Sequence, residues 1–517
     1  MLGSDPKLGV FLLLIFTRHS TNLTLLTPPK YGSVMHYGEA LGVRDEKGFF
    51  DLLDKMAAEI KKRDELVVVH HYDADGISSG AITIKALERE GKKISSICLK
   101  QLYKENINEI RALGKNYLFV DFGSGQMDYL LKEFDGNLFI IDHHQPVMYA
   151  GKVLELKWHA NPLLFGINGG TELSGAGAAF FFALALNKKN VDLSQLAIVG
   201  ALGDMQDNNS GSALIGLNRK IIEVAQEAKV VIVKKDLALY GRISRPLVSY
   251  LAYSSNPIIP ELTANEDNCK AFLAELGIQL KDPFTEQWLS YEDLSEEEKK
   301  IFSSALITHM VSVGVEEWKI KQLIGETYTF TKEGKKSPLR DGKEFATALN
   351  ACGRHKKPEV GLAICLGDRN PAGKFGEAIA MLEEHRTALR RGIEFVNQHG
   401  IEERKAFYFF DAADQIEESL VGIIAGMLYG SVIDENKPII ALARNNDGTM
   451  KVSGRGTSTL VRRGLNIGKA LKEIGTEIEG VEGGGHKVAA GARVPAEKID
   501  EFLALLGEKL GAQLARV

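Results

Sequence analysis

Three short apolar runs in the first half of the chain are each followed by residues that can bind a metal ion or a phosphate group. Two aspartates one residue apart follow the first run, a single aspartate follows the second, and an aspartate with two adjacent histidines follows the third. Carboxylate oxygens suit hard divalent cations, and a neutral imidazole is a common metal ligand. The residues are Asp73 and Asp75, then Asp121, then Asp142, His143 and His144.

Each of these signals has an ordinary structural explanation when taken alone. Asp73 and Asp75 can cap a helix, Asp121 can be a turn residue beside Gly123, and a histidine pair can be one core and one surface residue. A fourth aspartate, Asp204, lies in an apolar helical stretch, where it must be paired, metal-bound or at the helix end. Together the four signals predict a site for two divalent cations, Mn²⁺ or Mg²⁺, and the imidazoles favour Mn²⁺.

The elements that position these residues alternate between strands and helices. Short apolar runs predict buried strands, and amphipathic patterns predict helices between them. This alternation predicts a parallel sheet with helices on both faces, in which ligands bind beyond the carboxyl ends of the strands. The predicted strands are 66–69, 94–99, 117–120 and 138–141, and the first predicted helices are 49–62 and 78–88.

The composition is that of an ordinary globular protein with several domains. The 517 residues are 44% hydrophobic and 25% charged, and the net charge is −5. Four scattered cysteines without a CxxC pair argue against zinc-ribbon and redox sites and favour a cytoplasmic location. The apolar run at residues 9–16 is shorter than the roughly 20 residues of a membrane span, so we expect no membrane association and interpret residues 1–34 as an upstream extension.

Changes of pattern divide the chain into five predicted segments. The third contains prolines and a charged run and is predicted to be a mainly helical insertion. The last alternates strand patterns (406–410, 438–444 and 450–453) with helical ones (417–427 and 465–474), which predicts a smaller, mixed-sheet α/β domain. The segments are an N-terminal extension (1–48), the parallel-sheet domain (49–234), the insertion (235–343), a connector with a long helix (344–402) and the C-terminal domain (403–517).

Several motifs, in this order, resemble those of the DHH phosphoesterase superfamily. The first four are His71-Tyr72-Asp73-Ala74-Asp75-Gly76, Asp121, Asp142-His143-His144 and Gly203-Asp204. Leu349-Asn350-Ala351-Cys352-Gly353-Arg354 is similar to the NAxGR motif of RecJ-type nucleases. Two later segments, Ser453-Gly454-Arg455-Gly456 and the glycine-rich run from Gly484 to Gly491, resemble the DHH-associated C-terminal domain. The chain looks most like archaeal RecJ-like proteins, relatives of the RecJ-like subunit of the eukaryotic replicative helicase.

The resemblance implies a division of the metal ligands. Asp121 would bridge two cations, Asp73 would bind the first, and the second would be bound by Asp75, His143 and Asp204. Water activated by the cations would then be the nucleophile, so no protein nucleophile is needed.

The resemblance also implies roles near the phosphate and contains one departure. His144 would contact the scissile phosphate, and Asp142 would orient the neighbouring histidines. Many family members have a histidine four residues before the first aspartate of the DxD motif, where this chain has Val69. His71, less favourably His70, or a water molecule is expected to substitute for it.

Substrate contacts are expected mainly in the last part of the chain. Between residues 441 and 493, nine Lys or Arg residues face five Asp or Glu residues, which favours a groove for a nucleic-acid backbone over a solvated face. Arginine suits phosphate through its planar fork, and glycines allow backbone amides to approach it closely. The candidate substrate-binding residues are Arg354, Ser453, Arg455, Gly484, Gly485 and His486.

Three functions remain open from the sequence. The first hypothesis is an exonuclease that releases nucleoside monophosphates from single-stranded DNA or RNA in replication or repair, because a narrow cleft between two domains would exclude duplex. The second is a phosphodiesterase acting on short oligonucleotides or cyclic dinucleotides. The third, which the resemblance to archaeal RecJ-like proteins implies, is a replication scaffold that binds the GINS complex and the replicative helicase, with the insertion as the docking surface. Polarity, sugar preference and oligomeric state cannot be read from the sequence.

Overall fold

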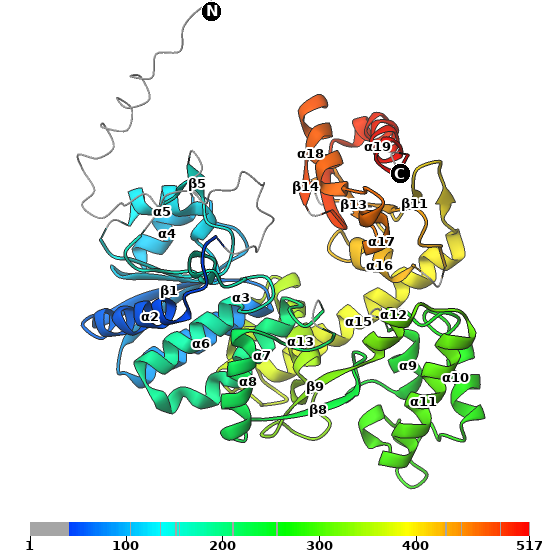
Figure 1. Cartoon of the computed structure of the whole chain (residues 1–517), viewed down its shortest axis with the longest axis horizontal. Helices are drawn as coiled ribbons and strands as arrows, with labels where there is room; N and C mark the ends of the chain where they lie inside the picture. The colour runs from blue at the N-terminus through cyan, green and yellow to red at the C-terminus, as the bar shows by residue number, and fades with distance from the viewer. Residues whose placement is uncertain are drawn as a thin grey trace, which may run out of the picture. The chain divides into compact units, whose positions relative to one another are not determined.

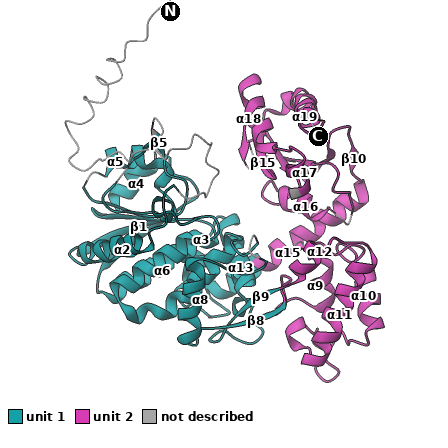
Figure 2. Cartoon of the chain, viewed as in Figure 1, with its two compact units in different colours: residues 1–236, 325–381 teal, residues 237–324, 382–517 magenta. Residues whose placement is uncertain are grey.

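The computed structural model describes residues 41–103, 105–134, 136–149, 152–154, 156–208, 211–254, 257–429, 432–445, 447–485 and 487–515. The chain forms two compact units, each built from two stretches of sequence (Figure 2). The first unit comprises residues 1–236 and 325–381, and the second comprises 237–324 and 382–517. This division is coarser than the five predicted segments, whose boundaries stay predictions.

A five-stranded parallel sheet forms the centre of the first unit. Its strand order is β2-β1-β3-β4-β7, and every neighbouring pair is parallel. The order reverses between β1 and β3, and such a switch point is where ligands bind in open α/β sheets. The strands are β1 (Glu65–His71), β2 (Lys93–Leu99), β3 (Tyr117–Val120), β4 (Leu138–Ile141) and β7 (His159–Ala160), with a separate pair β5 (Met148–Tyr149) and β6 (Lys152–Val153).

Helices cover both faces of this sheet, as predicted (Figure 1). On one face, α4 and α5 share a core with the strands, including Phe119, Ile110 and Leu130. On the other, α3 and α6 pack against the strands and against α7. The helices of this unit are α2 (Glu46–Ile60), α3 (Ala74–Arg89), α4 (Asn106–Ala112), α5 (Met127–Glu133), α6 (Gly175–Leu186), α7 (Ser194–Gly203) and α8 (Leu217–Glu227).

The chain leaves the first unit along β8 (Val231–Leu237) and returns along β9 (Ile324–Phe330), and these two strands pair. After β9, α13 (Gly342–Arg354) packs against α3 and α7, and α14 (Pro358–Cys365) packs against α3. The NAxGR-like motif therefore lies on α13 in the same unit as the parallel sheet.

Residues 237–324 are mainly helical, as predicted. Their helices enclose a core that includes Tyr250, Tyr291 and Phe302. Arg386 from the long helix α15 (Lys374–His399) donates to Ser244 Oγ at 2.8 Å, which ties this segment to the rest of the second unit. The helices are α9 (Leu247–Ala252), α10 (Glu266–Glu275), α11 (Glu296–Ser312) and α12 (Glu317–Ile320).

The C-terminal part of the second unit contains a mixed six-stranded sheet, which confirms the predicted fold class. Its order is β10-β11-β12-β13-β15-β14, with β11 and β12 parallel and the other pairs antiparallel. Apolar cores lie on the α16 side and on the α18 and α19 side. The elements are β10 (Glu402–Glu403), β11 (Tyr408–Asp411), α16 (Val421–Met427), β12 (Ile439–Arg444), β13 (Met450–Arg455), α17 (Ser458–Arg462), α18 (Ile467–Glu477), β14 (Glu482–Gly485), β15 (Ala489–Val494) and α19 (Ile499–Leu514).

Four helix starts differ from the sequence prediction. The helices predicted from residues 78 and 465 begin at Ala74 and Ile467. The helix predicted from residue 49 begins at Glu46, because Asp45 caps it by accepting from the Gly48 amide. The helix predicted from residue 417 begins at Val421. Within the described part of the chain, no helix is long and apolar enough to cross a membrane. Residues 1–40, with the apolar run at 9–16, lie outside the described residues.

Candidate metal centre

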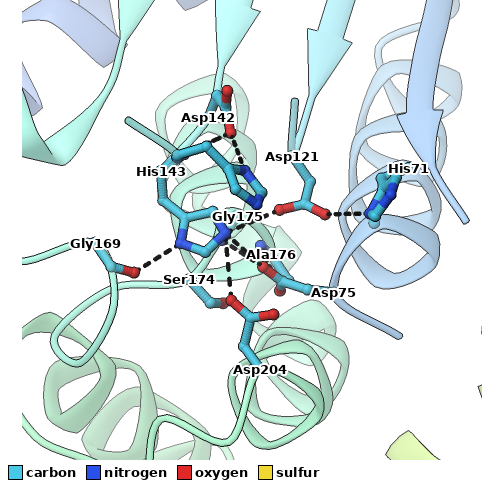
Figure 3. A network of polar contacts seen from close by, with 12 residues as sticks. His71, Asp75, Asp121, Asp142, His143, Gly169, Ser174, Gly175, Ala176 and Asp204 are labelled. Carbon is cyan, nitrogen blue, oxygen red and sulfur yellow. Dashed lines mark hydrogen bonds and ion pairs between the residues drawn. The ribbon is translucent and has the colours of Figure 1, made fainter. Parts of the chain in front are cut away.

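The carboxyl edge of the parallel sheet brings the predicted metal ligands together. Asp121 follows β3 and lies between His143, from the end of β4, and His71, from the end of β1 (Figure 3). Asp121 Oδ1 is 3.2 Å from His143 Nε2, whereas Asp121 Oδ2 is 3.8 Å from His71 Nδ1. The two oxygens of one carboxylate therefore face two different sets of residues.

The potential ligands form groups whose ligand atoms lie within 4.8 Å of one another. His143 Nε2 lies 3.3 Å from Asp204 Oδ2 and 3.5 Å from Asp75 Oδ2. The grouping separates Asp73 from Asp75, as the family resemblance implies. The three groups are His71, Asp73 and Asp121; Asp75, His143 and Asp204; and Asp121, His143 and His144.

Among the residues that the structure describes, several buried polar atoms of this centre have no hydrogen-bond partner. They are both carboxylate oxygens of Asp121, Nε2 of His143 and Nδ1 of His71. Asp121 is only 1% exposed, and burying an unpaired carboxylate is costly. A compensating positive charge would remove this cost. Because the free atoms are oxygens and imidazole nitrogens, the residues present fit divalent cations such as Mn²⁺ or Mg²⁺.

Asp73 and Asp75 also hold the starts of two helices, so the structural explanation and the metal-binding one are compatible. Asp73 Oδ1 accepts from the Gly76 amide of α3 at 3.0 Å. Asp75 accepts from the first two amides of α6, those of Gly175 at 2.7 Å and Ala176 at 3.0 Å. A helix N-terminus stabilises negative charge, so α6 fixes the Asp75 carboxylate in place.

Asp121 itself has a strained backbone and a tightly fitted neighbour. Its φ of +62° lies in the left-handed region, which is uncommon for residues other than glycine. A Cβ added to Gly175 would lie 2.2 Å from Asp121 Oδ1, closer than atoms can approach. The first residue of α6 must therefore be glycine for the Asp121 carboxylate to occupy this position. Such strain persists where the surrounding structure over-determines it, often at functional sites.

The adjacent histidines are held by different acceptors. His143 Nδ1 is 2.7 Å from the Gly169 carbonyl oxygen, and His144 Nδ1 is 2.8 Å from Asp142 Oδ1. Because both acceptors lack hydrogen, each Nδ1 must donate, which leaves each neutral ring a free lone pair on Nε2. Asp142 was expected to orient both histidines, but it orients only the ring of His144, together with the backbone of His143.

A buried polar network behind Asp142 was missed by the sequence analysis. The Ser124 amide donates to Asp142 Oδ2 at 2.9 Å, and Ser124 Oγ is 2.8 Å from His159 Nε2. Asn161 Nδ2 lies 2.9 Å from the same Oγ and donates to the His144 carbonyl at 2.8 Å. The available signal was the position of Asn161 directly after β7, at the same edge of the sheet.

The structure favours His71 over His70 as the residue that replaces the histidine missing at Val69. His71 Nδ1 lies 3.0 Å from Asp73 Oδ2 and faces Asp121. His70 is buried, its ring packs beside Gly80 of α3, and its Nδ1 is 2.9 Å from the His71 carbonyl. Val69 is buried in the core formed with α4 and α5.

Crowding of carboxylates shifts the acidities of the centre. Burial and the nearby charge of Asp75 raise the pKa of Asp121 well above its ordinary value, and the same two causes raise the pKa of Asp204 to about 8. Burial opposes the charged form of His143, but the carboxylates of Asp204 and Asp121 raise its pKa well above the ordinary value. The metal-free centre therefore retains protons that bound cations would replace.

We expect the metal-free protein to lose stability between pH 7 and 8.5. The raised pKa values mean that the folded state binds more protons than the unfolded state. As the pH rises, each such proton therefore lowers the free energy of unfolding by up to about 1.4 kcal/mol per pH unit. Burial lowers the pKa of three other histidines to about 4, which acts in the opposite direction but only below about pH 7. These are His70, His144 and His159.

Thermal unfolding in EDTA at several pH values measures this effect. The decline should be shallower in Asp204→Asn, unchanged in the matched control Asp64→Asn, and suppressed by Mn²⁺. Asp64 is exposed and lies just before β1, at the opposite edge of the sheet. A melting temperature that is flat or rises between pH 7 and 8.5 would contradict the raised pKa values of Asp121, Asp204 and His143.

The predicted substrate-binding residues lie in two places. Arg354 ends α13 in the first unit, where a Cβ on the neighbouring Gly353 would lie 2.2 Å from the Tyr72 carbonyl oxygen beside Asp73. Ser453 and Gly484 lie in the second unit, where both pair with Gly491 of β15 and so align across three strands.

The other three candidates also belong to the C-terminal segment. Gly485 is on the edge strand β14, and His486 lies outside the described residues. Arg455 packs against Gly422 and donates to Ser453 Oγ at 3.2 Å, and burial lowers the pKa of its guanidinium. A half-buried guanidinium held by neutral groups suits an anion such as phosphate. The basic excess of this segment is partly neutralised, since Arg493 pairs with Asp447.

The fold and the site define an α/β protein with a carboxylate–imidazole centre at the switch point of a parallel sheet. Three family models match the chain: "DHH family, N-terminal domain" over residues 65–203, "DHH-CID domain" over 239–324 and "DHHA1 domain" over 406–512. An uncharacterized protein of Methanocaldococcus jannaschii is 33% identical over 87% of this chain and 94% of its own length. The chain belongs to the DHH family of phosphoesterases, as a RecJ-like member, which confirms the resemblance seen in the sequence.

More distant relatives support the same fold. The single-stranded-DNA-specific exonuclease RecJ of Bacillus subtilis is 26% identical over 34% of this chain and 23% of its own length. Cdc45 of Entamoeba histolytica superposes with a TM-score of 0.58 at 14% identity, over 91% of this chain and all of that one. RecJ of Thermus thermophilus with Mn²⁺ gives a TM-score of 0.53 at 17% identity, over 90% of this chain and 55% of that one. At these identities the solved structures establish the fold alone.

Proposed function

We propose that this DHH phosphoesterase hydrolyses phosphodiesters with two divalent cations and acts as an exonuclease on single-stranded DNA or RNA. One observation carries the proposal: the two unpaired oxygens of the buried Asp121 face two separate groups of ligands. One carboxylate can thus bridge two ions. His71, Asp73 and Asp121 would hold one cation, and the group around His143 would hold the other.

Two cations would supply charge for the transferring phosphoryl group and lower the pKa of a water molecule. The protein supplies the rest of the arrangement. Asp142 holds the ring of His144 with Nε2 free, so this nitrogen can approach a phosphate oxygen beside Asp121. Asp142 and Asn161, which bind His144, are themselves buried and hydrogen-bonded. The ring is therefore fixed before substrate arrives.

A nucleic-acid substrate is supported by the relatives and by the cationic groups near the centre. The RecJ relatives are single-stranded-DNA-specific exonucleases, and RecJ structures contain Mn²⁺. Lys100 lies 5.8 Å from the Tyr72 ring centre, directly beside the first ligand group, and Arg354 follows the residue that packs on Tyr72. Release of nucleoside monophosphates in replication or repair would be the role of such an enzyme.

The direct test uses end-labelled single-stranded DNA and RNA, with matched duplexes, in Mn²⁺ or Mg²⁺. The proposal expects metal-dependent release of mononucleotides from single strands, and the labelled end gives the polarity. A rate that does not fall as strands lengthen from two to about twenty nucleotides distinguishes an exonuclease from a small-substrate phosphodiesterase. Equal degradation of duplex, or no hydrolysis of any strand, would contradict the proposal.

Exposed apolar side chains favour an additional docking function for residues 239–324. Phe284 is 93% exposed on a turn that the Asp282 carboxylate stabilises by accepting from the amides of Phe284 and Thr285. Trp288 is 55% exposed and forms a β-bridge with Lys281 across this turn. A hydrogen-bonded turn that presents two large aromatic side chains to solvent is typical of a binding surface. The family resemblance makes the GINS complex and the replicative helicase the expected partners.

We expect the full-length chain to recover GINS from a mixture of purified proteins. The Phe284→Ser, Trp288→Ser double variant should lose this binding and retain hydrolysis, because neither residue belongs to the groups of potential metal ligands. A matched control is Val43→Ser in the first unit, because Val43 is an apolar residue that is 91% exposed. Binding that is unaffected by the double variant, or absent from the wild-type chain, would contradict the docking function.

A further inference from the structure

The carbonyl of Gly169 accepts two hydrogen bonds, and one of its donors has no place in the chemistry described above. His143 Nδ1 donates to this oxygen at 2.7 Å, and Gln206 Nε2 donates to it at 2.8 Å. A carbonyl oxygen has two lone pairs, so both bonds can form together. Gln206 thus touches the acceptor that determines the orientation of a predicted metal ligand.

Gln206 is itself fixed by a second buried amide. Its Oε1 accepts from the side-chain Nδ2 of Asn218 at 2.7 Å, and the backbone amide of Asn218 donates to the Glu172 carbonyl at 2.8 Å. Gln206 is fully buried and Asn218 is 1% exposed. The direction of the side-chain bonds is determined, because the Gly169 carbonyl can only accept. Gln206 must present its NH₂ group to Gly169 and its oxygen to Asn218.

The position of Gly169 explains why its carbonyl needs support. A Cβ on Gly169 would lie 2.3 Å from the His143 carbonyl oxygen, so the two backbone segments are in close contact. Gly169 lies in a loop between a short 3-10 helix (Pro162–Phe165) and α6 and belongs to no strand or helix itself. The bond from Gln206, at the end of α7, therefore anchors this loop to the helix that also positions Asp204.

We infer that Gln206 is a positioning residue for the metal centre, which acts through the Gly169 carbonyl and depends on Asn218. The chain Asn218–Gln206–Gly169 holds His143 with its proton on Nδ1 and its Nε2 lone pair toward Asp75, Asp121 and Asp204. Without it, the carbonyl can turn away and His143 can take the other tautomer, whose Nε2 carries the proton and has no lone pair to offer a cation. This inference rests on the proposed function, because it assumes that His143 binds a cation.

The test is the affinity of the full-length protein for Mn²⁺, followed by electron paramagnetic resonance of the free ion. Gln206→Met keeps the side-chain length and removes the donor, and Asn218→Leu removes the group that orients it. We expect Gln206→Met to weaken Mn²⁺ binding about 10- to 100-fold, as loss of other partners of metal ligands does. Asn218→Leu should weaken it in the same direction, and the double variant should be no weaker than Gln206→Met, because both act along one chain.

The matched control is Gln195→Met on α7, which removes the bond from Gln195 Nε2 to Glu333 at 2.9 Å, away from the metal centre. It should bind Mn²⁺ as the wild type does. Wild-type affinity in a folded Gln206→Met protein would overturn the inference, as would additive losses in the double variant. If Gln206→Met does not fold, Asn218→Leu decides by the same criterion. A wild-type chain that binds no Mn²⁺ would instead overturn the proposed function.

Discussion

Asp121→Asn should reduce metal-dependent hydrolysis by at least about 10³-fold and leave the fold intact. Charge stabilisation by metal ions contributes several kcal/mol to a phosphoryl-transfer transition state, and each 1.36 kcal/mol corresponds to a factor of ten. Asparagine tolerates the left-handed backbone of this position, φ +62°, better than alanine does, so the change removes charge with little added strain. The reaction is measured with bis(p-nitrophenyl) phosphate and with a labelled single strand.

The stability of Asp121→Asn separates loss of the cations from misfolding. In EDTA, the variant should melt no lower than the wild type, because burial and Asp75 disfavour the charge that it removes. Asp64→Asn is the matched control and should retain full activity. Hydrolysis within tenfold of wild type in a folded Asp121→Asn protein would contradict the role of Asp121 as a shared ligand.

Gly175→Ala should lower hydrolysis by about 100-fold although it adds only one methyl group. That methyl carbon would lie 2.2 Å from Asp121 Oδ1 and 2.8 Å from Asp121 Cβ and Cγ, so the carboxylate or the start of α6 must move. A displacement of about 1 Å in a catalytic arrangement can cost roughly this factor. The Gly175 amide also holds Asp75, so both ligand groups would be disturbed.

The control for Gly175→Ala is Gly334→Ala in the same unit, where the nearest contact of an added Cβ is 3.8 Å, from Ser337. It should leave activity and Mn²⁺ affinity unchanged. We expect Gly175→Ala to lose affinity for Mn²⁺ in parallel with activity. The added methyl group should also lower the free energy of unfolding of this variant by about 1–3 kcal/mol. Full activity in Gly175→Ala would show that the Asp121 carboxylate is not held where the structure places it.

Much of the site could be predicted from the sequence because its residues follow strands that read clearly as apolar runs. The runs before Asp121 and Asp142 match β3 and β4 residue for residue. Parallel strands bring their carboxyl ends to one edge of the sheet, so residues that follow successive strands lie close together. The alternative between His71 and His70 required the structure, since it depends on which face of β1 each ring occupies.

Other parts of the site depend on contacts that no local pattern reveals. Helix α6 is buried on all sides and so has no amphipathic pattern, although its first amides hold Asp75. The Gly169 carbonyl is a backbone group, which no residue type marks in the sequence. Its donor Gln206 lies far from Gly169 along the chain, so no local pattern links the two. The sequence left three explanations for Asp204, namely an ion pair, a bound metal or a helix end. The structure places it at the end of α7 beside His143.

The most direct test of the central claim is the number of Mn²⁺ ions bound per chain, counted by electron paramagnetic resonance during a titration of the metal-free protein. We expect two ions on the wild-type chain and at most one on Asp121→Asn, with Asp64→Asn unchanged at two. One ion or none on the wild type, or two ions on Asp121→Asn, would contradict a centre of two cations that share Asp121.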